Sequence, residues 1–188
     1  MASAITHFIV GASLALPAVD SAAIGSVLPR WAIPVSAGLF AVAPDLDTFA
    51  MQAFGIPFRS FFGHRGFFHS PFFLLLVSAA LAVRVARAHP RRTIAWIAAL
   101  WGGCAVTHPL LDALTDGGSG VMLLFPFSDA RLFFPWRPIH VSPLSISRFF
   151  DVAGYILGSE LPFCASAIAL GVFGFLAGRL HAARLPNV

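Results

Sequence analysis

The sequence TIAWIAALWGGCAVTHPLL, residues 93–111, contains no Asp, Glu, Lys or Arg. A membrane-spanning helix needs about 20 mostly apolar residues, and this stretch meets that requirement. Arg91 and Arg92 precede it, whereas His108 lies near its other end and Asp112 follows directly. The stretch therefore predicts a transmembrane helix with one basic end and one end that carries possible metal ligands.

The composition of the 188-residue chain is that of a membrane protein. Hydrophobic residues make up 58% of the chain and charged residues 11%, whereas a soluble domain usually carries about 25% charged residues. The basic residues are all Arg and are scattered, so no basic face for nucleic acid is expected. We predict an all-α integral membrane protein that forms one transmembrane domain over residues 1–188. The five predicted spans are 5–28, 31–43, 71–86, 93–111 and 161–180. Pro17 and Asp20 are weak points of the first span.

The arginines predict the orientation of these spans, because short basic loops stay in the cytoplasm. Five alternating spans place the following arginines on one side: Arg30, Arg84, Arg87, Arg91, Arg92, Arg179 and Arg184. We therefore expect the N-terminus outside and the C-terminus inside. Every clustered His and Asp then lies near the outer face.

His108 and Asp112, in the motif THPLLD at 107–112, are four positions apart and share one helical face. An ionised carboxylate within a span costs about 2.5–3.5 kcal/mol on insertion scales. A bound metal would offset this cost. The alternative is an Asp–His hydrogen bond that locks two helices together.

The stretch GHRGFFHS, residues 63–70, places His64, Arg65 and His69 directly before an apolar span. The two histidines are too far apart for one helical face, but the glycines allow a bend that brings both rings to one point. Arg65 suits a planar anion such as phosphate or carboxylate. The alternative is an interfacial loop that faces lipid headgroups.

Two further motifs complete the predicted site. PDLD, residues 44–47, places two carboxylates on an extended or turning segment after a span that Pro44 should end. His7 lies near the start of the first span. A solvated turn and an interfacial histidine are the simpler interpretations of these motifs in isolation. The predicted metal ligands are His7, Asp45, Asp47, His64, His69, His108 and Asp112.

Imidazole and carboxylate ligands without thiolate suit zinc, with manganese or iron as alternatives. The number of candidates allows one to three divalent ions. A metal would lower the pKa of bound water, and a carboxylate outside the ligand set, Asp47 or Asp116, would take the proton. Arg65 would hold the charge that develops on the substrate.

Residues 114–160 are predicted to form an outer, interfacial insertion. Within it, LLFPFSDARLFFPWRPIH at 123–140 interleaves aromatic residues with Arg131 and Arg137. This mixture is typical of a lid on the membrane surface, where Arg131, Arg137 and His140 would bind an anionic headgroup. The alternative is an amphipathic surface or re-entrant helix.

Together these motifs resemble the YdjM-like family (DUF457), described as LexA-binding, inner-membrane-associated, metal-dependent hydrolases. The resemblance covers most of the chain, and its most specific part is HRGFFHS. It rests on TH at 6–7, PDLD at 44–47, GHRGFFHS at 63–70, THPLLDALTDGG at 107–118 and LLFPFS at 123–128. It implies a multi-pass protein of the bacterial inner membrane with a zinc-type site. LexA binding finds no support, because the sequence has no helix-turn-helix signature.

The family is distantly similar to the helical zinc-dependent phospholipase C and S1–P1 nuclease group. The pair in THPLLD matches one ligand pair of that group, and the other predicted ligands match it loosely. Many family members continue PDxD with a histidine, whereas this chain has Thr48.

The function expected from these features is a membrane-embedded, metal-dependent hydrolase that cleaves a phosphoester in a lipid or lipid-linked substrate. The choice of a phosphoester follows from the distant similarity and from Arg65. A metal or proton transporter is one alternative, although it would distribute ionisable residues through the bilayer. The other is a structural or regulatory membrane protein in which the same side chains lock helices.

Overall fold

The computed structural model describes residues 1–143 and 145–184. Their regular structure is helical, with β-pairing limited to isolated bridges that join Thr115 to Ile139 and Val121 to Leu132. The α-helices are α1 (Ala4–Leu14), α2 (Ala22–Gly25), α3 (Ala32–Val42), α4 (Asp47–Phe54), α5 (Pro71–Ala86), α6 (Arg91–Ala113) and α7 (Ile146–Arg184). The 3₁₀ turns are η1 (Leu16–Ala18), η2 (Ala43–Leu46) and η3 (Phe67–His69). The prediction of an all-α protein is confirmed.

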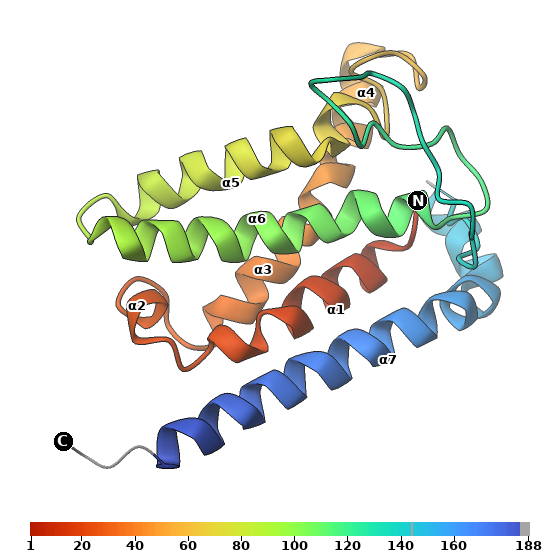
Figure 1. Cartoon of the computed structure of the whole chain (residues 1–188). Coiled ribbons are helices and arrows are strands. Elements are labelled where there is room, and N and C mark those ends of the chain that lie inside the picture. Colours follow the sequence, from red (N-terminus) through yellow and green to blue (C-terminus); the bar gives the residue numbers. More distant parts are fainter. Residues whose placement is uncertain (144, 185–188) are drawn as a thin grey trace.

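The helices form a bundle with two distinct ends. α5 and α6 form an antiparallel hairpin, and α1 packs against α3, α6 and α7. The N-terminus, α4 and the C-terminal end of α6 lie at one end, together with the long loop after α6 (Figure 1). We call this end, which lies at the right in Figure 1, the upper end. The turn between α5 and α6, α2 and the last turns of α7 lie at the opposite, arginine-rich end.

The third and fourth predicted spans agree closely with α5 and α6. α5 begins at Pro71 because the Ser70 side chain accepts a hydrogen bond from the Phe73 N–H over 3.2 Å, which satisfies a free donor of the first turn. α6 runs from Arg91 to Ala113, slightly beyond the predicted span at both ends. These two boundaries could be predicted because local sequence determines them.

The prediction of one continuous span over 5–28 is wrong. α1 ends at Leu14, and Pro17 lies in η1, where its missing N–H and fixed φ favour a turn. Asp20 is then bound on the surface by Arg30 and Arg179. α3 is also short, at about 16 Å, compared with a hydrocarbon core of about 30 Å. The count of five spans is therefore not confirmed.

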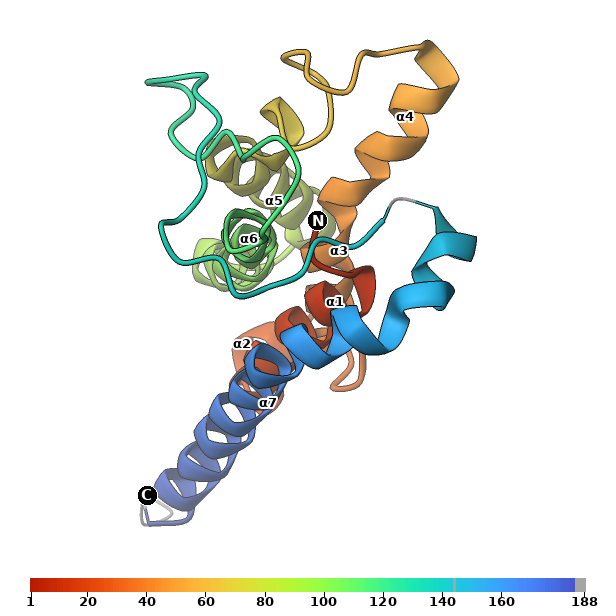
Figure 2. The ribbon, with the colours of Figure 1, turned by 90° about the vertical axis from the view of Figure 1, so that its right-hand side faces the viewer.

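Two helices of the described residues, Arg91–Ala113 and Ser147–Arg184, are long and apolar enough to cross a membrane. The second is far longer than the predicted span 161–180, because α7 already begins at Ile146. The last part of the predicted interfacial insertion, residues 146–160, is thus helical and continuous with the predicted span 161–180. The α7 ribbon bends between its first turns and its long lower part, and Pro162 lies inside the helix (Figure 2).

Small residues bring α1 and α3 into close contact. A Cβ atom on Gly11 would lie 2.8 Å from the Ala37 carbonyl oxygen, and one on Gly38 would lie 2.7 Å from the Phe8 ring. α3 is held against α6 by Phe40, which stacks on Trp101 with ring centroids 4.5 Å apart. These contacts place the end of α3 beside the last turns of α6, where the polar residues gather.

Candidate metal centre

All seven predicted ligands meet at the upper end of the bundle, and all are buried. α1 carries His7, η2 carries Asp45, and α4 begins with Asp47. Before α5, a loop carries His64 and η3 ends with His69, and the last turns of α6 carry His108 and Asp112. Segments from four parts of the chain therefore deliver imidazoles and carboxylates to one place.

The first group consists of Asp45, His69, His108 and Asp112, and we call it the primary group. The Nε2 atom of His108 lies 3.3 Å from Asp45 Oδ1 and 3.7 Å from Asp112 Oδ2. The Nε2 atom of His69 lies 3.6 Å and 3.9 Å from the same two oxygens. Two imidazole nitrogens and two carboxylates thus converge on one point.

The backbone of α3 orients His108. Pro44 ends α3, so the Ala41 carbonyl belongs to the last turn, where carbonyls lack helical partners. His108 Nδ1 lies 2.7 Å from that oxygen, which can only accept a hydrogen bond. Nδ1 therefore carries the proton, and the lone pair of the neutral ring is on Nε2, facing the carboxylates.

The second group consists of Asp47, His64 and His69, and we call it the outer group. Asp47 Oδ1 lies 3.0 Å from His64 Nδ1, and Asp47 Oδ2 lies 3.2 Å from His69 Nδ1. His69 belongs to both groups, but a neutral imidazole has only one acceptor nitrogen. If Nδ1 donates to Asp47, Nε2 is free for the primary group, which is the usual carboxylate–histidine–metal arrangement.

His7 lies at the edge of the primary group. Its ring stacks on His108 with centroids 3.7 Å apart, and its Nε2 lies 3.6 Å from Asp112 Oδ1. Asp112 Oδ1 also accepts a hydrogen bond from the Ala2 N–H over 2.7 Å. Both ring nitrogens of His7 are buried without hydrogen-bond partners in the described part of the chain, but His7 belongs to neither group.

The residues fit a divalent cation by three criteria. Two ligand atoms about 2.0–2.1 Å from a zinc ion at the tetrahedral angle lie about 3.4 Å apart, close to the separations here. The Nε2 atoms of His69 and His108, both oxygens of Asp45 and Asp112 Oδ2 are buried without hydrogen-bond partners, which is rare in folded proteins. Finally, the buried Asp45, Asp47 and Asp112 carry three negative charges, and the buried Arg65 carries one positive charge. One divalent ion would neutralise the remaining two negative charges.

The pKa values of the loop histidines show the same charge excess. Burial lowers the pKa of His69, but its contacts with Asp45 and Asp47 outweigh burial and raise the pKa to about 9. Burial also lowers the pKa of His64, and there it outweighs the hydrogen bond with Asp47. Without a metal, the site would thus bind a proton at His69, where two carboxylates face it.

Arg65 was expected to face a substrate anion, but the structure places it fully inside the protein. Its guanidinium donates to the Gly117 carbonyl over 2.9 Å and to Thr115 Oγ1 over 2.8 Å, and its Nε lies 3.1 Å from Asp112 Oδ2. The backbone of Arg65 has φ of 63°, a left-handed conformation that is uncommon outside glycine. Because the Gly117 carbonyl and Thr115 fix the guanidinium, its contact with Asp112 holds that carboxylate in position.

The bend of GHRGFFHS is as tight as expected, but for a different reason. Gly63 and Gly66 have no positive φ; a Cβ on either would collide with the backbone of 57–61. The glycines are needed for close approach of two chain segments, and Arg65 takes the left-handed turn.

Comparison with known proteins agrees with this description. A family model described as YdjM inner membrane protein matches residues 1–182. The chain belongs to the YdjM family of inner membrane proteins. The inner membrane protein YbcI of Escherichia coli (strain K12) is 37% identical over 124 residues, which cover 65% of this chain and 70% of that protein. No solved structure matches the chain. The resemblance seen in the motifs is confirmed, and so is an inner-membrane location.

Two of the predicted headgroup-binding residues of this YdjM family member differ in their surroundings. Arg131 donates to the carbonyls of His64 and Ser60 over 2.8 Å and 2.7 Å, so it holds the histidine loop. Arg137 is exposed, with its guanidinium 5.0 Å from the Phe133 ring centroid. Arg137 is thus the one of the pair whose guanidinium faces the surroundings of the protein.

Asp116 and His140 form a separate pair beside the YdjM-type site. Asp116 accepts from the Val141 N–H over 2.8 Å and lies 2.8 Å from His140 Nδ1. Slight burial raises the pKa of Asp116, but these two hydrogen bonds outweigh it and lower the pKa. His140 stacks on Tyr155. The structure therefore does not bring Asp116 into either group of ligands.

Sequence reasoning missed two supports of the site. Thr115 accepts a hydrogen bond from the Arg65 guanidinium; it lies inside the motif THPLLDALTDGG, but the spacing of that motif gave its side chain no role. Glu160 is buried in α7 and accepts hydrogen bonds from the Ser3 N–H, the Ser3 hydroxyl and the Thr6 hydroxyl. Glu160 is a lone acidic residue directly before an apolar run, and this position in the sequence could have pointed to its buried role. It fixes the start of α1, and with it His7.

Proposed function

We propose that this protein is a membrane-embedded, metal-dependent hydrolase that cleaves a phosphoester in a lipid or lipid-linked substrate. The observation that carries the proposal is the primary group: four buried ligand side chains whose converging atoms have no hydrogen-bond partner among the described residues, with Arg65 as the one cation beside them. Such a cluster costs free energy unless a cation binds it. We further propose that it holds one divalent ion, with zinc preferred to manganese or iron.

The side chains around the primary group have separate roles in this proposal. A bound divalent ion supplies the polarisation of an ester and of a water molecule. Asp47 orients His64 through Nδ1, which leaves Nε2 of His64 unpartnered and placed to accept a proton. Arg65 positions Asp112 and balances part of its charge, and it does not contact the substrate, because its side chain is enclosed.

The preference for a lipid substrate rests on the position of the site. The ligands lie at one end of the bundle, and the basic connections lie at the other. If short basic loops are cytoplasmic, the site belongs to the outer half of the membrane. The segments at this end of the bundle carry exposed aromatic side chains: Phe54 ends α4, and Phe127 and Trp136 belong to the loop after α6. Tryptophan favours the headgroup region, and phenylalanine can insert beside it.

The test combines metal analysis with turnover. Purified protein is loaded with zinc, manganese or iron and mixed with vesicles that contain phosphatidic acid, phosphatidylglycerol or phosphatidylethanolamine. We expect release of phosphate or a phosphorylated headgroup by the wild type with one of these ions. The Asp112→Asn variant should lose it, whereas Asp151→Asn, on the exposed surface of α7, should keep it. No turnover on any of these lipids would contradict the proposal.

One observation favours a second function, a structural metal site. Four protein ligands complete a tetrahedral zinc shell, as in structural sites, whereas catalytic sites keep a position for water. X-ray absorption on the loaded protein separates the two functions. A four-coordinate ion with only protein ligands would support the structural function, and a five- or six-coordinate ion with bound water would support the hydrolase.

A further inference from the structure

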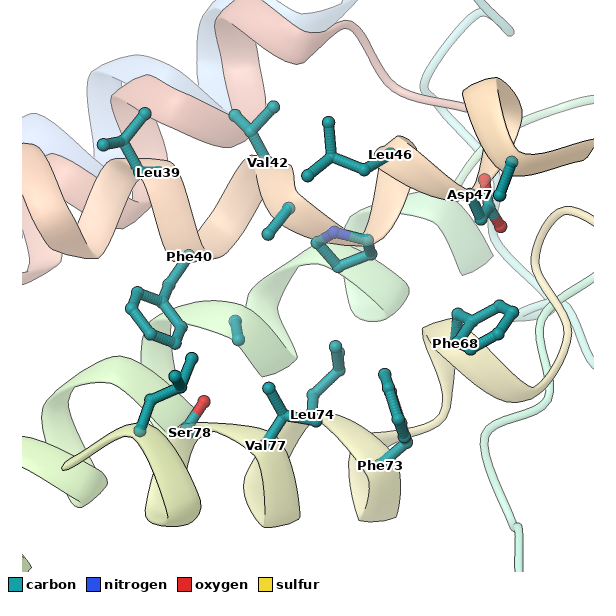
Figure 3. A pocket seen from close by; sticks show the side chains of 15 residues that line it. Leu39, Phe40, Val42, Leu46, Asp47, Phe68, Phe73, Leu74, Val77 and Ser78 are labelled. Carbon is teal, nitrogen blue, oxygen red and sulfur yellow. The ribbon is translucent and has the colours of Figure 1, made fainter. Parts of the chain in front are cut away.

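An apolar groove of about 580 Å³ begins at the outer group and runs along the bundle between α3 and α5. α3 and η2 line one side, α5 lines the other, and α6 lies behind (Figure 3). Sites of roughly 300–1,000 Å³ are typical for small-molecule ligands. The groove is thus large enough for a ligand, and its position relative to the metal centre indicates which kind.

The lining is apolar except at its two ends. Val42, Leu74 and Val77 line the middle, Phe40 and Ser78 lie at one end, and Asp47 lies near Phe68 at the other, the upper end (Figure 3). Asp47 is at the same time the carboxylate that bridges His64 and His69. The groove is therefore continuous with the candidate metal centre, and a molecule with a long apolar part could lie in it with its polar end at Asp47.

The length of the groove matches one leaflet of a bilayer. On α5 its lining extends from Phe73 to Leu81, a rise of about 12 Å at about 1.5 Å per residue. Half of the hydrocarbon core of a bilayer is about 15 Å. Ser78 and Ala105, both buried and small, leave room for the ligand at the lower part.

We infer that this groove binds one fatty acyl chain of a glycerophospholipid and thereby places its phosphate group beside the candidate metal centre. This inference rests on the proposed function, because it names the part of the lipid that the protein recognises. A straight acyl chain fits a groove that ends within one leaflet, whereas a polyprenyl chain would extend well beyond it. Lipids that merely surround the protein would contact all of its exposed apolar surface equally.

The experiment is photo-crosslinking, which needs no turnover. The metal-loaded protein is placed in vesicles of phosphatidylethanolamine and phosphatidylglycerol with a small share of phosphatidic acid that carries a diazirine on one acyl chain. After irradiation, mass spectrometry locates the labelled residues. We expect label on Leu74, Val77 and Leu81 in clear excess over Leu170 and Phe173, which are exposed on α7.

Two variants of α5 provide the control. Val77→Trp fills the groove and should remove most of the groove label, whereas Leu76→Trp, exposed on the same helix but outside the groove, should leave it unchanged. Both variants should retain the metal, which shows that they fold. Equal label on the groove and on α7, or groove label that survives Val77→Trp, would overturn the inference. Preferential label from a diazirine-bearing polyprenyl phosphate would overturn the acyl assignment.

The outcomes for the two proposals can be separated. Groove-specific label without hydrolysis of any tested lipid would refute the hydrolase and leave the acyl groove intact. Hydrolysis with uniform label would support the hydrolase and refute the groove.

Discussion

The Nδ1 atom of His108 donates a hydrogen bond to the backbone carbonyl of Ala41 over 2.7 Å, so the end of α3 sets the tautomer of a histidine on α6. The opposite nitrogen then faces Asp45 and Asp112. Pro44 makes this possible, because it ends α3 and leaves carbonyls of its last turn free. Packing of two helices and the chemistry of the metal centre are therefore coupled.

Metal content should depend on His108. We expect about one divalent ion per chain in the wild type and none in His108→Ala, because a primary-group ligand is lost. His140→Ala removes a histidine outside both groups and should retain the ion. Inductively coupled plasma mass spectrometry of detergent-purified protein measures this. An ion that remains in His108→Ala would show that the primary group is not the metal site.

Loss of Arg65 should destabilise the protein. Arg65→Ala leaves Asp112 without its buried cation, and breaking a buried ion pair costs about 3–5 kcal/mol. The exposed Arg137→Ala should change the free energy of unfolding by less than about 0.5 kcal/mol. Denaturant unfolding of the metal-free proteins in detergent gives both values. Equal stabilities would mean that the contact between Arg65 and Asp112 contributes nothing.

Asp47 should tune metal affinity without being essential for binding. In Asp47→Asn the carboxylate that orients His69 is lost, and such a change typically lowers metal affinity about 10–100-fold. Asp129→Asn, at an exposed loop position, serves as the control. Competition with a chelator gives the dissociation constants. Complete loss of metal in Asp47→Asn would instead indicate that Asp47 is itself a ligand.

Glu160 should contribute to stability through the N-terminal segment. Its carboxylate accepts three hydrogen bonds from Ser3 and Thr6, and hydrogen bonds to charged groups contribute about 1.5–3 kcal/mol each. Glu160→Gln keeps the shape but loses one acceptor oxygen, so we expect a loss within this range. Asp151→Asn on the same helix should have no effect. Hydrogen exchange of the first turn of α1 should rise only in Glu160→Gln.

The orientation in the membrane can be tested with single cysteines. Phe127 is 96% exposed in the loop at the upper end, and Arg87 lies at the opposite end. Because the basic end should be cytoplasmic, Phe127→Cys should react with an impermeant maleimide on intact cells, and Arg87→Cys should react only after lysis. The native Cys104 and Cys164 are buried, so their background should be low. The reverse pattern would invert the orientation.

Much of the metal centre could be predicted because its chemistry is local. The four-residue spacing of His108 and Asp112 puts both on one helical face, and the Ser70–Pro71 pair begins α5. The gathering of the histidines and aspartates at one end was predicted from the alternation of five spans, the first of which is broken in the structure. Apolar composition, in contrast, cannot separate a helix from a turn, so the first span was drawn through its weak point at Pro17 and the early start of α7 was missed.

The sequence by itself determined the membrane character, the family and the types of ligand, because each depends on which residues occur and on their spacing. Only the tertiary structure decided that Arg65 is enclosed with Asp112, that Asp47 links two histidines, and that a groove leads to them. These relationships join residues far apart in the chain. They arise when packed helices bring those residues within a few ångströms, and no short stretch of sequence encodes that distance.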